Sequence, residues 1–122
     1  MGFASPGRRE KYVQKALEFI SENYAEKISL SDIAHHCGLS TSELCRTFKK
    51  TMRQTPFEYL LRYRVNQSLS FLLDPNNNIT EVAMQCGFQN SSYYCRIFKQ
   101  YMDMPPSKYI KQMQKKNESS IR

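Results

Sequence analysis

The sequence predicts an all-α fold in which two similar helical subdomains are joined by a long connector helix. Three observations lead to this prediction. Apolar residues recur at helical spacing along most of the chain. The phrase LCRTFKKTM at 44–52 returns almost unchanged as YCRIFKQYM at 94–102. No segment has the alternating pattern that is typical of a β-strand.

The first subdomain is expected to contain three helices before a break. Residues 1–7 are expected to be a flexible leader or an expression remnant, and helical spacing starts at about Arg8. In ISLSDIAHHCG, Ser29 is followed three residues later by Asp32, which predicts a capped helix start. Gly38 is expected to end that short helix, and a second Ser/Thr cap begins STSELCRTFKKTM.

The connector is the longest periodic segment, PFEYLLRYRVNQSLSFLL, and it closes on the turn sequence DPNNN. At about 1.5 Å per residue this segment is expected to run roughly 27 Å. The pattern then restarts, because ITEVAMQCGF repeats LSDIAHHCGL at an offset of 49, which becomes 50 after the glycine. The predicted boundaries are 8–54 for the first subdomain, 55–74 for the connector, 75–114 for the second subdomain and 115–122 for a disordered tail.

Positive charge gathers in two patches that each contain one copy of the repeated phrase. The net charge is +7. Residues 40–64 hold six basic and two acidic side chains, and residues 90–116 hold six and one, whereas 65–89 hold only two acidic ones. For a single basic amphipathic helix, an ordinary surface helix and a DNA-binding helix are about equally expected. The same pattern in two copies favours a polyanionic partner.

Each copy has the order short helix, tight turn at Gly, second helix, which is the helix-turn-helix motif. In DNA-binding proteins the second helix of this motif enters the major groove. Arg46 and Arg96 carry a fork that can bind guanine O6 and N7 together, so they are the expected base readers. The hydroxyl groups expected to reach base edges or phosphates are those of Ser42, Ser91 and Ser92. The expected phosphate contacts are Lys49, Lys50, Arg53, Lys99 and Lys108. Tyr93 lies off the apolar face, where it would pack on the DNA backbone or a thymine methyl group, or be exposed.

These units, with PFEYLLRYRV, ITEVAMQCGF and SSYYCRIFKQYM-DMPPSKYI, resemble the DNA-binding domain of the AraC/XylS transcription regulators over about residues 8–114. The resemblance implies seven helices in two homeodomain-like helix-turn-helix subdomains, whose recognition helices lie in successive major grooves ~34 Å apart. By position, it implies base contacts at Ser42, Cys45, Arg46, Ser91, Ser92, Tyr93 and Arg96. The glycine that is frequent in the family before the Pro break is replaced here by Arg53 and Asp103.

The implied function is sequence-specific binding of double-stranded DNA that regulates bacterial transcription. The segment DMPP is similar to the small stand-alone activators of the family. RNA polymerase is a candidate second partner, this domain is expected to be monomeric, and a full-length protein is a candidate dimer. The alternative is a basic helical module that binds RNA or a protein partner.

Other classes find little support in the sequence. No nucleophile–base pair, Gly-rich phosphate loop or paired-acid motif occurs, so neither catalytic residues nor cofactors are expected. His35 and His36 diverge on a helix, so no metal site with Cys37 is expected. The four cysteines lack a C-x-x-C pair and are expected to be reduced, although Cys45 is a candidate redox switch. Without a secretory signal or an apolar run of about 20 residues, a cytoplasmic location and no membrane contact are expected.

Overall fold

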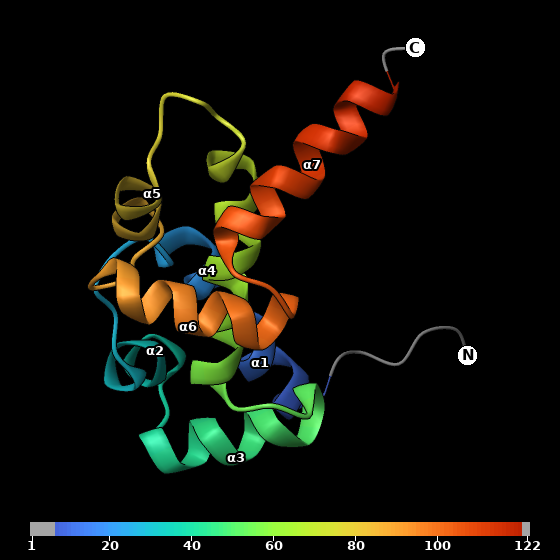
Figure 1. Cartoon of the computed structure of the whole chain (residues 1–122). Helices are drawn as coiled ribbons and strands as arrows, with labels where there is room; N and C mark the ends of the chain where they lie inside the picture. The colour runs from blue at the N-terminus through green and yellow to red at the C-terminus, as the bar shows by residue number, and fades with distance from the viewer. Residues whose placement is uncertain (1–6, 121–122) are drawn as a thin grey trace. The chain divides into compact units, whose positions relative to one another are not determined.

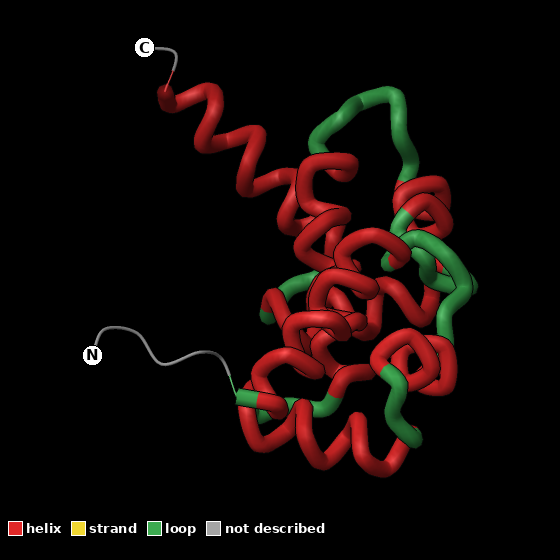
Figure 2. Tube along the Cα trace, turned by 180° about the vertical axis from the view of Figure 1, so that it is seen from behind, coloured by secondary structure: helices red, strands yellow, loops and turns green. Residues whose placement is uncertain are grey.

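Seven α-helices and no strand make up residues 7–120, the part of the chain that this computed structural model describes (Figure 1, Figure 2). The all-α prediction and its seven helices are therefore confirmed. In chain order the helices are α1 (Arg8–Asn23), α2 (Leu30–Cys37), α3 (Thr41–Met52), α4 (Pro56–Leu72), α5 (Ile79–Gln85), α6 (Ser91–Met102) and α7 (Pro106–Ser120).

The chain divides into two compact units, Met1–Leu61 and Arg62–Arg122, and the boundary between them falls inside α4. The segment expected as the connector is a continuous helix that begins with Pro at its first position, where the missing N–H group costs nothing. Its first residues belong to one unit and its remaining residues to the other. The two units are thus built on the two ends of the same helix.

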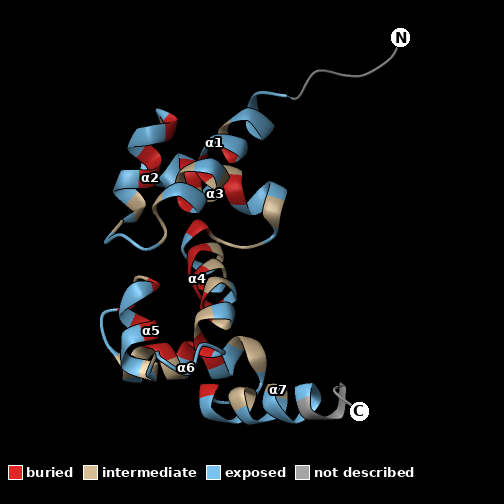
Figure 3. Ribbon diagram, turned by 90° about the horizontal axis from the view of Figure 1, so that it is seen from above, coloured by how far each residue is buried: buried red, intermediate tan, exposed pale blue. Residues whose placement is uncertain are grey.

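In the first unit, α1 packs against both α2 and α3. The residues that these helices bury are no more than 4% exposed, and Figure 3 colours buried stretches of α1, α2 and α3 in red. They are Val13, Ala16, Ile20, Ile33, Ala34, Cys37, Leu44 and Phe48. Each helix therefore has one apolar side that is removed from water, which is the main driving force for packing.

In the second unit, α6 packs against α5 and α7. Tyr94 and Phe98 of α6 have no exposed surface. The Tyr94 hydroxyl donates a hydrogen bond to Ser68 Oγ of α4 at 2.7 Å, and Ser68 Oγ donates to the Val65 carbonyl at 2.6 Å. The buried polar atoms of this pair are therefore satisfied, which avoids the cost of an unpaired hydroxyl in the core.

The turn of each helix-turn-helix motif is repeated in three dimensions. Gly38 has φ +74° and Gly87 has φ +93°, both in the left-handed region that favours glycine. The N–H group of the next residue then bonds back into the helix, from Leu39 to the Ala34 carbonyl at 2.9 Å. A Cβ atom on Gly38 would meet nothing within 4 Å, so this glycine is required for its backbone conformation and not for space. The predicted end of α2 at Gly38 is confirmed.

At the two ends of the chain, part of the prediction lies outside the described residues and part of it differs from the structure. Residues 1–6 of the expected leader lie outside the described residues, and Gly7 is the N-cap of α1. The disordered tail expected at 115–122 is wrong over 115–120, because α7 continues to Ser120. The segment after Tyr109 contains no Gly or Pro and includes several Lys and Gln residues, which favour a helix. Residues 121–122 lie outside the described part.

Candidate nucleic-acid interface

The first turn of α3 is fixed by a capping box. The Glu43 N–H group donates to Ser40 Oγ at 3.1 Å, and the Ser40 N–H group donates to Glu43 Oε1 at 3.0 Å. The bond from the Ser40 backbone N–H group, followed by the Ser40 hydroxyl, holds the pKa of the Glu43 carboxyl below its ordinary value, and the positive charge of Arg46 adds to the effect. The start of α3 is therefore a defined point from which the following side chains project.

Beyond this start, α3 has one buried and one exposed side. Leu44 is 1% exposed and Phe48 is fully buried, with its ring edge-on to Tyr59 at a centroid distance of 5.8 Å. The exposed side carries Ser42, Arg46, Lys49, Lys50 and Arg53. Cys45 is half-buried between the two sides. All predicted contact residues of the first unit except Cys45 are therefore exposed to solvent.

The last of these residues, Arg53, also ends α3. Its φ of 62° is in the left-handed region, and its N–H group bonds to the Lys49 carbonyl at 2.9 Å. Asp103 ends α6 in the same way, with φ 61° and a bond of 2.9 Å to the Lys99 carbonyl. The frequent glycine of the family thus corresponds to a left-handed C-cap, a conformation that here two non-glycine residues adopt.

The first turn of α6 is capped differently. The Tyr93 N–H group donates to Asn90 Oδ1 at 2.8 Å, so the N-cap bond is present. Tyr93 stands where α3 has Glu43, and its side chain has no carboxylate to accept the return bond from the N-cap residue. The aromatic ring at this position is therefore available for other contacts.

The sides of α6 repeat those of α3. The buried side carries Tyr94, Ile97 and Phe98, and the Phe98 ring lies edge-on to Tyr109 at 5.8 Å, matching the Phe48–Tyr59 pair of the first unit. Ser92, Arg96 and Lys99 are exposed, as is Lys108 at the start of α7. Ser91, Tyr93 and Cys95 are half-buried. The predicted residues of the second unit thus fall on α6 and on the first turn of α7.

Tyr93 is surrounded by groups from three elements of its unit. Its ring centroid lies 6.0 Å from that of Phe88, in the turn after α5. On α6 itself, the Arg96 Cζ atom lies 5.3 Å from the Tyr93 centroid, within the range of a cation–π contact. The third neighbour is Arg64 of α4, which interacts electrostatically with Tyr93. Tyr93 is therefore half-buried and in contact with other side chains of its unit.

Arg64 is the residue of this region that sequence reasoning missed. It is only 7% exposed, and burial lowers the pKa of its guanidinium, while Tyr93 and Cys86 partly oppose that effect. Burial also raises the pKa of Cys86, to about 11, which keeps this thiol neutral. The sequence reading did not separate Arg64 from Arg62, the other basic residue of the connector. The Tyr93–Arg96 contact could have been found, because residues three apart are neighbours on a helix.

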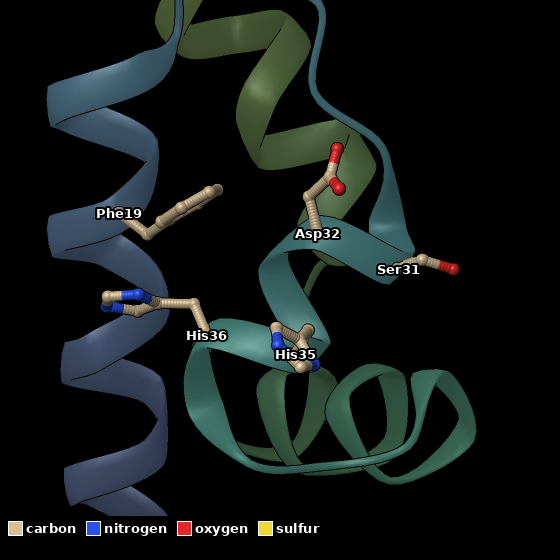
Figure 4. Close-up of a pocket in the computed structure, with 5 residues that line it drawn as sticks. All are labelled: Phe19, Ser31, Asp32, His35 and His36. Carbon is tan, nitrogen blue, oxygen red and sulfur yellow. The ribbon is translucent and has the colours of Figure 1, made fainter.

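An open hollow of about 600 Å³ lies apart from the predicted contact residues of the first unit (Figure 4). It is lined by Phe19 of α1 and by Ser31, Asp32, His35 and His36 of α2. The ring centroids of His36 and Phe19 lie 4.8 Å apart. In Figure 4 the His35 side chain does not point toward Phe19. Among the described residues, no group of three His, Cys, Asp or Glu side chains could hold a metal ion. Nor is any helix of the described chain both long and apolar enough to span a bilayer.

Comparisons with known proteins concern the family and the fold. The model of the helix-turn-helix domain family matches residues 33–112. The HTH-type transcriptional regulator YdeC of Bacillus subtilis is 43% identical over 99 residues, which are 81% of this chain and 34% of that protein. Curated relatives are longer, since this chain spans only 34–40% of the length of several that it matches.

Two solved structures have the same fold. The C-terminal domain of the two-component response regulator yesN from Fusobacterium nucleatum is 28% identical, with a TM-score of 0.74 over 85% of this chain and 99% of that one. The DNA-binding domain of AdpA, solved in complex with a target DNA, is 19% identical, with a TM-score of 0.79 over 93% of this chain and 96% of that one. At that identity the second likeness shows the fold alone.

Proposed function

The chain belongs to the helix-turn-helix domain family in its AraC type, a DNA-binding domain of transcription regulators, and on that premise we propose that α3 and α6 each read part of one site on double-stranded DNA. In this proposal the two helices enter successive major grooves. One observation carries it. Arg46 and Arg96 occupy equivalent exposed positions, each followed three residues later by an exposed Lys and lying opposite a buried Phe.

The proposed roles follow from side-chain chemistry. Arg46 and Arg96 bind base edges, because a guanidinium can donate two hydrogen bonds to one guanine. Flexible single cations bind phosphate oxygens and carry no sequence information. We assign base contacts to Ser42, Cys45, Arg46, Ser91, Ser92, Tyr93 and Arg96. We assign phosphate contacts to Lys49, Lys50, Arg53, Lys99 and Lys108.

The test is selection of bound duplexes from a random library, followed by affinity measurements on the recovered duplex and on random duplex. Arg46→Ala and Arg96→Ala are each expected to cost about 1–3 kcal/mol of binding free energy on the recovered duplex and to relax preference at one base pair. Lys49→Ala is the matched control on the same face of α3, and it should weaken binding to all sequences alike.

Two outcomes would contradict this function. If Arg46→Ala weakened random duplex as much as the recovered one, Arg46 would not be a base reader. If the protein bound an unrelated RNA as tightly as the recovered duplex, it would be a general basic helical module instead. A DNA reader should prefer its site to random duplex by a factor of about 10³ or more.

The wider setting is also proposed. The domain acts as a monomer, since its two units supply two recognition helices in one chain. It works in the bacterial cytoplasm as part of an activator, with RNA polymerase as a second partner and a full-length protein that is a candidate dimer. We expect no catalytic activity and no cofactor. Measuring the molecular mass of the protein alone and in complex with the recovered duplex tests whether the domain is a monomer in both states.

A further inference from the structure

We propose that Tyr93 positions the guanidinium of Arg96 and thereby sets how sharply α6 discriminates between base pairs. The inference rests on the proposed reading of bases by Arg96 and adds the residue that controls it. Tyr93 is then a positioning residue for Arg96, in addition to the base contact assigned to it above. The observation behind it is the Arg96 Cζ atom over the Tyr93 ring, 5.3 Å from the centroid.

The Tyr93 ring is itself held in place, which a positioning residue must be. Its backbone N–H group is fixed by Asn90 Oδ1 at 2.8 Å, which sets the first turn of α6. Phe88 packs against the ring with 61° between the planes, at 6.0 Å between centroids. A half-buried ring with these neighbours has few alternative orientations.

The contact with Tyr93 is compatible with reading of DNA by Arg96. A guanidinium can stack on an aromatic ring through its flat face, while its five N–H donors point outward in its plane. The two donors that bind guanine O6 and N7 can therefore remain available while the face is held. Holding a long side chain before binding removes part of the entropy cost of ordering it at the interface.

The equivalent position in α3 has the opposite chemistry. Glu43 lies three residues before Arg46, as Tyr93 does before Arg96, and its carboxylate is engaged with Ser40 while attracting Arg46. An acidic group beside Arg46 offsets part of the charge that the arginine presents to DNA. The two arginines thus have the same place in the repeat but different partners, so the inference applies to α6 alone.

The experiment uses the duplex recovered by selection on the parent protein, with each base pair changed in turn. The base pair at which Arg96→Ala loses discrimination serves as the reporter, and discrimination is the ratio of Kd values for altered and original duplex. Tyr93→Leu should lower this ratio about two- to fivefold, the effect of one exposed cation–π contact. Tyr93→Phe should retain most of the parent ratio, because it retains the ring, and the part that it loses measures the contact of the hydroxyl with DNA.

The chain offers a matched control at the other end of α6. The Arg62 Cζ atom lies 5.3 Å from the centroid of the Tyr101 ring, the same distance as in the Tyr93–Arg96 pair. Tyr101→Leu therefore removes a similar contact from the same helix, and the ratio at the reporter base pair should stay unchanged. An equal loss in Tyr101→Leu would show general loosening of α6 and would overturn the inference.

A measurement without DNA covers the case in which Tyr93→Leu unfolds. In the NMR spectrum of the parent protein, the Arg96 δ-CH₂ protons should be shifted upfield by the ring current of Tyr93. The shift should persist in Tyr93→Phe. Its absence from the parent spectrum would overturn the inference, whatever the binding data show.

The remaining outcomes separate the inference from the proposed function. If Arg96→Ala changes no ratio, Arg96 reads no base, and the proposed function of α6 fails together with the inference. If Arg96→Ala lowers the ratio but Tyr93→Leu does not, only the inference is overturned. If Tyr93→Phe loses as much as Tyr93→Leu, the hydroxyl and not the stacked ring is responsible, which also overturns it.

Discussion

At Arg53 the backbone of α3 turns into the left-handed region, and the backbone of α6 does the same at Asp103. Left-handed conformation costs a non-glycine residue about 1–2 kcal/mol, because Cβ approaches the following carbonyl oxygen. Asp tolerates this region better than Arg, since its short side chain can bond locally. Arg53 therefore stores local strain at a position where it is also proposed to contact phosphate.

Replacing this arginine should move stability and DNA affinity in opposite directions. Arg53→Gly is expected to raise the free energy of unfolding by about 0.5–1 kcal/mol, the relief of strain minus the greater entropy of unfolded glycine. It should also weaken binding to every duplex, because one cation is lost. Urea unfolding and titration with random duplex measure the two effects.

Arg53→Ala is the control, because it removes the same charge without the freedom of glycine. It should weaken DNA binding as much as Arg53→Gly does but should bring no gain in stability. If the two variants were equally stable, the left-handed C-cap would not be a source of strain.

On the scale of elements, four of the helices begin with a capping box. In α2, α3 and α5, and also at Thr55 before α4, the N-cap side chain accepts a bond from the residue three on, and that residue's carboxylate accepts one in return. These starts could be predicted from sequence wherever Ser or Thr preceded an acidic residue, because the pattern is local. The end of α2 could be predicted for the same reason.

Contacts between elements could not be predicted in this way. Ser68 and Tyr94 are 26 residues apart, and nothing in either local sequence indicates that their hydroxyl groups meet. Arg64 was not distinguished from Arg62, the exposed basic residue two positions before it, until packing showed that Arg64 is buried. The repeated phrase predicted which sides of α3 and α6 face the core, because helical spacing alone decides that. The same spacing places Glu43 beside Arg46 and Tyr93 beside Arg96, because residues three apart are neighbours on a helix.

The capping boxes predict how stability depends on pH. The pKa values of Glu43 and Glu58 are lowered from an ordinary value of 4.5, first by the N–H groups of Ser40 and Thr55 and then by their hydroxyls. A lowered folded-state pKa stabilises the fold fully above pH 4.5, and this contribution is lost as pH falls through the lowered value. The free energy of unfolding should therefore fall on acidification below pH 4.5.

The measurement is urea unfolding across this acidic range for the parent protein and for the double variant Glu43→Gln/Glu58→Gln. The variant cannot titrate at these positions, so its stability should depend less on pH than that of the parent. An equally steep acid dependence in both proteins would mean that other groups control acid unfolding.

On the scale of the whole molecule, the salt dependence of binding should report the proposed phosphate contacts. Each neutralised phosphate contributes about −0.9 to the slope of log K against log salt concentration. Replacing Lys49, Lys50 and Arg53 by Ala should reduce the slope by roughly 3, and replacing Lys99 and Lys108 by roughly 2. Equal changes for the two sets, measured by titration at several salt concentrations, would contradict the assignment of three phosphate contacts to the first unit and two to the second.

The missing carboxylate at the start of α6 has a consequence for motion. In α3 the amide of the N-cap residue, Ser40, is held by Glu43, whereas α6 has Tyr93 at the equivalent position. We expect the first turn of α6 to open more often, so that the Asn90 amide exchanges with deuterated solvent faster than that of Ser40. Native-state hydrogen exchange measures this difference, and bound DNA should reduce it. Tyr93, the ring that orients Arg96, would then stand where a carboxylate would otherwise hold the N-cap amide. The N-terminal end of α6 would therefore be more mobile than that of α3 before DNA binds.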